Sequence, residues 1–140
     1  MADSAAITRA LVLLVEDDED ARASCADALR RAEFEVLEAG TRWQARETIN
    51  ARTPDVIVLD LRLPDGNGIA AARAWRKSAA LSATPILILT GHSTKADVDS
   101  ALVAGCEAFL TKPCPADVLV MHIERTLAAS RPTRRPSKLF

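Results

Sequence analysis

Four short segments of this chain, largely apolar, each lead into a polar residue that can take part in chemistry. They are followed by Glu16 and Asp17, by Asp60, by Thr90 and by Lys112. Apolar runs of this length are typical of strands that are covered on both faces of a parallel sheet. If the four strands are neighbours, their carboxyl ends share one edge, where ligands bind in open α/β sheets. The pattern therefore predicts one acidic pocket that also holds a hydroxyl and an amine.

Helical patterns alternate with these strands. Residues 34–39 alternate apolar and polar side chains, which predicts an additional edge strand. Five β-α units with short connections predict a parallel sheet between layers of helices, and right-handed crossovers make it doubly wound. A loop rich in turn formers is expected over residues 63–68. The expected helices cover residues 18–33, a segment capped by Thr41 and broken at Thr53-Pro54, and residues 69–81, 96–104 and about 115–129.

The composition is that of one globular domain of 140 residues, with 49% hydrophobic and 26% charged residues. We expect residues 1–8 to be an N-terminal extension, 9–129 the domain, and 130–140 a basic, proline-containing tail or linker. Four positive charges lie in that tail, so the remaining chain carries a net charge near −5. This balance argues against direct nucleic acid binding by this chain.

The first apolar segment is too short for a signal peptide or a membrane span, so we expect a cytoplasmic protein without membrane contact. Cys25, Cys106 and Cys114 are odd in number and show no Cys-x-x-Cys spacing. They are therefore expected to be free thiols rather than parts of a disulfide framework or a zinc site.

Three carboxylates in one pocket would repel one another unless a cation lay between them. Mg²⁺ typically takes one or two carboxylates, waters and a phosphate oxygen. A carboxylate beside Mg²⁺, faced by Lys112 and Thr90, has the groups that phosphoryl transfer to a carboxylate needs. Taken singly, each residue has a simpler interpretation: Asp60 as a cap, Thr90 as a capping hydroxyl and Lys112 as a solvated charge. Asp18, Glu19 and Asp20 are best explained as charges at a helix N-terminus.

Residues 9 to 129 resemble a receiver domain of the two-component response regulators (the CheY-like superfamily). The matching pieces are Leu-Val-Glu16-Asp17-Asp18, Val-Leu-Asp60-Leu-Arg-Leu-Pro64-Asp-Gly-Asn-Gly68, Ile-Leu-Thr90-Gly91 and Ala-Gly105-Cys-Glu-Ala-Phe109-Leu-Thr-Lys112-Pro113. The resemblance implies a flavodoxin-like α/β fold, in which a doubly wound five-stranded parallel sheet of order 2-1-3-4-5 is flanked by five helices. It also implies a cis peptide bond at Lys112-Pro113.

The resemblance implies a role for each matched residue. Asp60 would be the phosphoacceptor and Lys112 would pair with the phosphoryl group. Thr90 would be the switch hydroxyl and Phe109 the switch aromatic residue, which would repack the surface of the fourth helix, fifth strand and fifth helix. The implied ligands of Mg²⁺ (or Mn²⁺) are Asp17 directly, Glu16 largely through water, Asp60, and the backbone carbonyl of Arg62.

Arg62 and His92 occupy positions that vary in this family, and both would flank the phosphoryl group. A cation at either position could contact phosphate oxygens or obstruct the hydrolytic water, which would change the lifetime of the acyl phosphate. A solvated side chain at the rim of the pocket is the alternative for both residues.

The implied partners are a sensor histidine kinase or histidine phosphotransferase, and an effector domain or downstream protein. Surface residues of the first helix, such as Arg22, Ala26 and Arg30, would determine the cognate kinase. Dimerisation through the fourth helix, fifth strand and fifth helix is open to such a domain, but no feature of this sequence requires it.

Three other classes remain as alternatives. Haloacid-dehalogenase-like phosphatases have a general acid two residues after the nucleophile, where this chain has Arg62. A nucleotide-binding domain would carry Gly-x-Gly-x-x-Gly after the first strand, and this motif is missing. A pseudo-receiver that serves only as an interaction scaffold would not need to retain the matched residues. The sequence thus favours a phosphorylation-dependent signalling switch over an enzyme that turns over a substrate.

Overall fold

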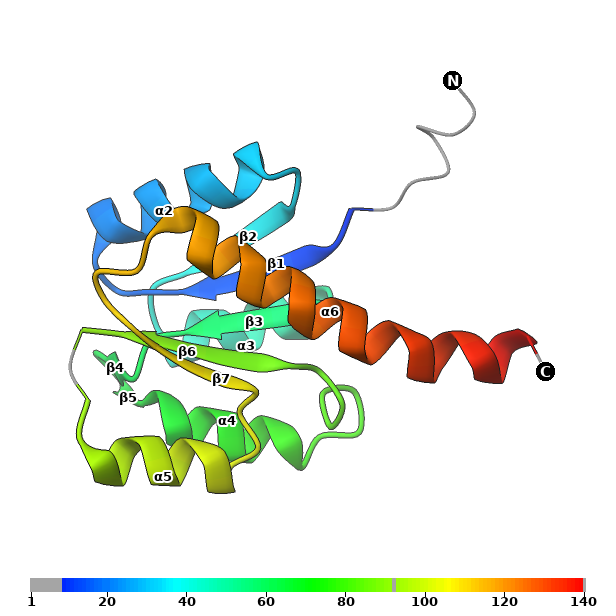
Figure 1. The fold of residues 1–140 in the computed structure, drawn as a ribbon. Coiled ribbons are helices and arrows are strands. Elements are labelled where there is room, and N and C mark those ends of the chain that lie inside the picture. The colour runs from blue at the N-terminus through cyan, green and yellow to red at the C-terminus, as the bar shows by residue number, and fades with distance from the viewer. Residues whose placement is uncertain (1–8, 92, 140) are drawn as a thin grey trace.

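A five-stranded parallel sheet forms the centre of the protein in the computed structural model, which describes residues 9–91 and 93–139 (Figure 1). Its spatial order is β2-β1-β3-β6-β7, which is 2-1-3-4-5 when the strands of this sheet are counted along the chain. This order confirms the predicted fold, including the position of β2 at an edge. The strands are β1 (Leu11–Val15), β2 (Glu35–Ala39), β3 (Val56–Leu59), β6 (Ile86–Thr90) and β7 (Ala108–Thr111).

Five helices cover the two faces of this sheet (Figure 1). Helices α2 and α6 pack on one face, and α3, α4 and α5 pack on the other. The number of helices confirms the prediction for the described part of the chain. Their bounds are α2 (Glu19–Arg31), α3 (Arg42–Ala51), α4 (Gly68–Arg76), α5 (Lys95–Val103) and α6 (Ala116–Leu139).

The three central strands β1, β3 and β6 are buried on both faces, as expected for a sheet between two helical layers. Because successive side chains of a strand point to opposite faces, each strand contributes to two cores. Val12 and Leu14 of β1 pack with α2 and α6, whereas Leu13 and Val15 pack with the other three helices. The apolar sequence of β1 is thus required at every position.

Polar side chains cap the starts of four helices, among them α4, where the Asn67 side chain accepts from the backbone N–H groups of Ile69 and Ala70. The Asp18 carboxylate accepts a hydrogen bond from the backbone N–H of Ala21 at 2.8 Å and so caps α2, whereas the sequence analysis had assigned Asp18 only as a charge at the helix N-terminus. Thr41 caps α3 as predicted, and Thr94 forms a capping box with Asp97 at the start of α5.

The loop after β3 is more ordered than the sequence predicted. Residues 63–68 were predicted as a loop only. With Arg62 they include a two-stranded antiparallel ladder of β4 (Arg62–Leu63) and β5 (Gly66–Asn67). Gly66 takes a positive φ of 145°, which a residue with a side chain rarely adopts. The turn-forming sequence therefore makes a tight hairpin immediately after Asp60.

Helix α4 ends at Arg76, five residues before the predicted end at Leu81. The N–H groups of Lys77 and Ser78 bond to carbonyls three residues earlier, which tightens the last turn. The Arg76 guanidinium then donates to the carbonyls of Leu81, Ser82 and Thr84. These bonds give the carbonyls of the turn after α4 a hydrogen-bond donor, so this turn is stable without continuing the helix.

Helix α6 runs to Leu139, whereas the sequence predicted an end near residue 129. The prediction treated Pro132 and Pro136 as helix breakers. Each proline removes one helical N–H, and the backbone continues as a helix past both.

Cys25, Cys106 and Cys114 are free thiols, of which Cys106 is buried and the other two are half-buried. Burial raises the pKa of Cys25 and of Cys106 to about 11, so both are protonated thiols at neutral pH. Within the residues that the structure describes, no helix has both the length and the apolar character needed to cross a membrane.

Candidate functional site

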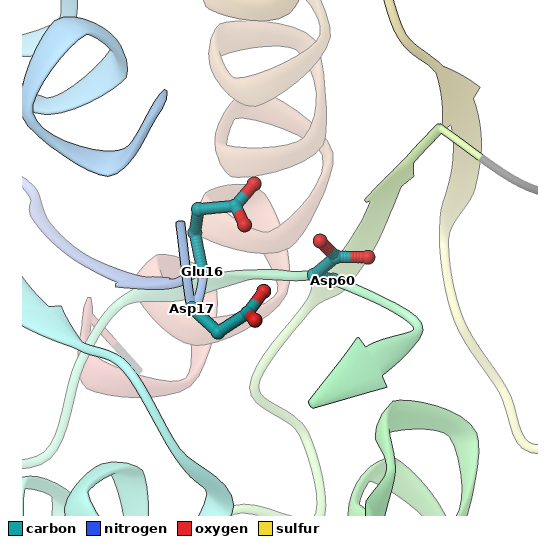
Figure 2. Close-up of side chains that lie close together, drawn as sticks. All are labelled: Glu16, Asp17 and Asp60. Atoms are coloured by element: carbon teal, nitrogen blue, oxygen red, sulfur yellow. The ribbon is translucent and has the colours of Figure 1, made fainter. Parts of the chain in front are cut away.

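Two neighbouring strands place three carboxylates at one edge of the sheet. Val15 and Leu59 are paired in the parallel register of β1 and β3, so the residues that follow them emerge side by side. Carboxylate oxygens of Glu16, Asp17 and Asp60 lie within 4.8 Å of one another (Figure 2). This is the only such acidic cluster among residues 9–91 and 93–139. The predicted convergence of these three residues is confirmed.

Lys112 joins this cluster from the end of β7. Its backbone N–H donates to the carbonyl of Thr90 at 2.8 Å, which continues the β6–β7 pairing and fixes its position. Its ammonium donates to Oδ2 of Asp60 at 3.3 Å and also to Oε1 of Glu16. The Lys112-Pro113 peptide bond is cis, as the resemblance implied.

Hydrogen bonds to both its carboxylate and its backbone fix the position of Glu16. It is 5% exposed, and its Oε2 accepts a hydrogen bond from the backbone N–H of Asp18 at 3.0 Å. Its own carbonyl accepts from Nη1 of Arg22 at 2.8 Å. Arg22 also pairs with Glu38 at 3.4 Å. Sequence reasoning had assigned Arg22 only to kinase recognition and had missed this support of the site.

Asp60 is 8% exposed, and its surroundings are equally constrained. Its backbone N–H donates to the carbonyl of Val15 at 3.0 Å, and its Oδ1 accepts from the backbone N–H of Arg62 at 3.3 Å. A Cβ atom added to Gly68 would lie 2.2 Å from the carbonyl oxygen of Asp60. Gly68 must therefore be glycine. Gly68 is part of the matched motif, but only the close approach of the start of α4 to the Asp60 backbone explains why this position is glycine.

The charges in this pocket shift the pKa values of two groups. Burial raises the pKa of Glu16, as does the negative charge of Asp60, while hydrogen bonds from Lys112 and Asp18 offset part of this rise. Burial alone would lower the pKa of Lys112, but the hydrogen bond to Glu16 and the charge of Asp60 outweigh it and raise that pKa. Lys112 therefore stays charged at neutral pH, and the two buried carboxylates share its positive charge.

The donor set fits a hard divalent cation. It offers one carboxylate oxygen from each of three residues, and Mg²⁺ prefers oxygen ligands of this kind. Two of the carboxylates are buried, and the third, Asp17, is exposed. An acidic triad of this kind is typical of the Mg²⁺ sites of receiver domains, the family that the sequence resembles.

The remaining predicted site residues take different positions. Thr90 is 1% exposed and is the last residue of β6. Phe109 is half-buried, lies opposite Ile88 in the register of β7 with β6, and packs against the core on the side of α3, α4 and α5. The side chain of Arg62 is exposed. His92 lies outside the described residues. The roles assigned to these residues stay predictions.

One expected surface residue of the first helix is buried. Ala26 has no exposed area and packs in the core between α2 and the sheet, so it cannot contact a kinase. Its spacing placed it on the same side as Arg22 and Arg30, but its small side chain faces inward. Arg30 itself is exposed and contacts the Val36 carbonyl and Glu38.

Comparisons with known proteins agree with this geometry. The family model described as "Response regulator receiver domain" matches residues 12–124. The KDP operon transcriptional regulatory protein KdpE of Escherichia coli is 35% identical over 128 residues, which cover 91% of this chain and 56% of that protein. The transcriptional regulatory protein PdtaR of Mycobacterium tuberculosis is 36% identical over 121 residues, which cover 86% of this chain and 57% of that protein. The chain thus spans little more than half the length of these curated relatives.

Solved structures show the same architecture. Chemotaxis protein CheY4 of Vibrio cholerae superposes with a TM-score of 0.81 at 27% identity, covering 85% of this chain and 99% of that one. NtrX of Brucella abortus gives a TM-score of 0.85 at 30% identity, covering 95% of this chain and 30% of that one. Receiver domains are signalling switches rather than enzymes that turn over a substrate, and they pair with histidine kinases. From its sequence match, its fold and its acidic triad, this chain belongs to the response regulator receiver domain family of two-component systems.

Proposed function

We propose that Asp60 accepts a phosphoryl group from a sensor histidine kinase or a histidine phosphotransferase. The observation that supports this proposal is the position of Asp60, whose carboxylate lies among two further carboxylates and 3.3 Å from the Lys112 ammonium. A nucleophile in this position is flanked by groups that bind cations on one side and phosphate oxygens on the other.

In the proposed transfer, a carboxylate oxygen of Asp60 attacks the phosphorus of a phosphohistidine. A new P–O bond forms while the P–N bond breaks, and the imidazole leaves with the electron pair and takes up a proton. Lys112 neutralises charge on the transferring oxygens, and its present bond to Asp60 holds it at the correct place. The backbone N–H of Arg62 orients the Asp60 carboxylate through Oδ1.

Asp17 would hold Mg²⁺ directly, with Glu16 acting largely through water, and Asp60 and the carbonyl of Arg62 completing the protein ligands. Mn²⁺ would fit the same oxygen donors. When bound, the ion supplies positive charge that offsets the negative charge of the phosphoryl oxygens. Lys112 contacts two of the three carboxylates with a single positive charge, so the cluster keeps an excess of negative charge and Asp17 is available to a metal ion.

Phosphorylation then acts through Thr90 and Phe109. An aspartyl phosphate adds about one unit of negative charge and several acceptor oxygens to the pocket. Thr90 would move toward the phosphate, and Phe109 would follow, which repacks the surface formed by α5, β7 and α6. Moving a two-state equilibrium from mostly off to mostly on takes roughly 5 kcal/mol. That surface would contact an effector or downstream protein, or a second copy of the chain, in the cytoplasm.

The direct test is phosphorylation with acetyl phosphate and MgCl₂, followed by intact-mass measurement. The chain should gain the mass of one phosphoryl group, and Asp60→Asn should gain none. Asp27→Asn is a matched control, because Asp27 is an exposed carboxylate on α2 whose ion pair among the described residues is with Arg31. A chain that gains no phosphoryl group under conditions that label a known receiver would instead be an interaction scaffold.

A further inference from the structure

A cavity of about 680 Å³ lies between α3 and α4, and none of the carboxylates of the acidic cluster lines it. This volume falls within the range of roughly 300–1,000 Å³ that is typical of small-molecule sites. Its walls come mainly from the two helices and from the turn that follows α4, with Thr53 after α3 and Asp65 from the turn between β4 and β5. The cavity is therefore large enough for a ligand and is separate from the site described above.

Both tryptophans of the chain line this cavity. Trp43 on α3 is 63% exposed, whereas Trp75 on α4 is half-buried and packs against the core. An indole offers a large flat apolar face and one N–H donor, so an aromatic ring can stack on it and a polar group can bond to it. The two indoles supply stacking surfaces for a planar ring.

Two arginines in the lining of the cavity, Arg42 and Arg46, provide positive charge for an anionic ligand. Arg42 and Arg46 lie one helical turn apart on α3. The one carboxylate in the lining, Asp65, accepts hydrogen bonds from the backbone N–H groups of Arg42 and Trp43, at 2.8 and 2.9 Å. These bonds lower the pKa of Asp65, so it stays ionised. Among the described residues Arg46 forms no ion pair, so its guanidinium is available to an anion.

We infer that this cavity binds a planar aromatic molecule that carries a phosphate or carboxylate group. The ring would stack on the indoles over an apolar floor that includes Ile49 and Leu81. The anion would pair with Arg46, and a guanidinium is well suited to phosphate and carboxylate geometry. A nucleotide and a simple aromatic acid both combine a planar ring with an anionic group, and a titration with each distinguishes them. The inference does not depend on phosphorylation of Asp60.

Trp43 and Trp75 provide the measurement, because their two indole N–H signals report on this cavity in an NMR titration. AMP, adenosine and benzoate are added separately to the full chain. We expect both signals to shift and saturate with at least one of the two anions, and adenosine to bind more weakly than AMP. Saturation by AMP and not benzoate identifies a nucleotide site, and the reverse identifies a site for aromatic acids.

Arg46→Gln should weaken binding of the effective anion about tenfold or more, as expected for loss of a charged hydrogen bond. Arg73→Gln is the matched control, because Arg73 is exposed on α4 and does not line the cavity. The inference is overturned if neither anion gives saturable shifts at millimolar concentration. It is also overturned if the two variants bind equally well.

Discussion

The ammonium of Lys112 lies 3.3 Å from Oδ2 of Asp60, although 52 residues separate them in the chain. The same ammonium donates to Glu16, so both buried carboxylates share one positive charge. Asp17 forms no ion pair within the described part of the chain, and the cluster keeps an excess of negative charge. This excess determines how the protein should respond to metal ions and to pH.

Mg²⁺ should stabilise the folded protein through Asp17. A ligand that binds only the folded state at ten times its Kd adds about 1.4 kcal/mol to the free energy of unfolding. Urea unfolding with MgCl₂, compared with NaCl of equal ionic strength, measures this gain. Asp17→Asn should lose most of it, and Asp20→Asn, an exposed acid on the first turn of α2, should keep it. Equal gains in the two variants would contradict the assignment of Asp17 as a ligand.

Glu16→Gln should stabilise the metal-free protein at pH 7. The pKa of Glu16 is raised in the folded state above its ordinary value of 4.5, so folding favours the protonated form. The stability that this group contributes is present below that value and is lost as pH rises through the folded pKa. The amide removes this loss, so the gain should be larger at pH 7 than at pH 4. Urea unfolding across this range checks it, and a variant less stable than wild type at pH 7 would refute the explanation.

Much of this site could be predicted because parallel strands bring their carboxyl ends to one edge. The apolar segments before Glu16, Asp60 and Lys112 were sufficient to predict their convergence. The local sequence also predicted the cap at Thr41 and the acidic N-terminus of α2, since both involve residues within one turn.

Contacts between distant segments could not be predicted in this way. Asp65 caps the N-terminus of α3 from 23 residues away, and no local pattern indicates this. The early end of α4 depends on hydrogen bonds from Arg76 to carbonyls of the turn that follows. The Ala-rich sequence after Arg76 predicts a longer helix and gives no sign of these bonds. The burial of Ala26 depends on how α2 rotates against the sheet, and alanine is compatible with either environment.

Gly68→Ala should destabilise the protein and disturb Asp60. The added Cβ would lie 2.2 Å from the carbonyl oxygen of Asp60, so the backbone must shift. Overpacking of this kind costs about 1–3 kcal/mol. Gly91→Ala is the control, because a Cβ there meets no atom within 4 Å. Urea unfolding should separate the two variants, and equal stabilities would show that α4 does not press on Asp60.

Arg62→Ala should change the rate of autodephosphorylation more than threefold. Arg62 is exposed two residues after Asp60, where its guanidinium can reach phosphate oxygens or the path of the hydrolytic water. The loss of phosphoryl mass over time after removal of acetyl phosphate gives the rate. Arg73→Ala should leave it unchanged. A half-life of phosphorylated Arg62→Ala equal to that of wild type would assign Arg62 to the solvated rim.

The central claim is that the carboxylate of Asp60, and no other in the cluster, receives the phosphoryl group. Treating the phosphorylated protein with borohydride reduces an acyl phosphate to an alcohol, which marks the modified residue for peptide mass spectrometry. The account predicts homoserine at position 60, with Glu16 and Asp17 unchanged. Reduction at either of those residues, or none in a protein that has gained phosphoryl mass, would contradict it.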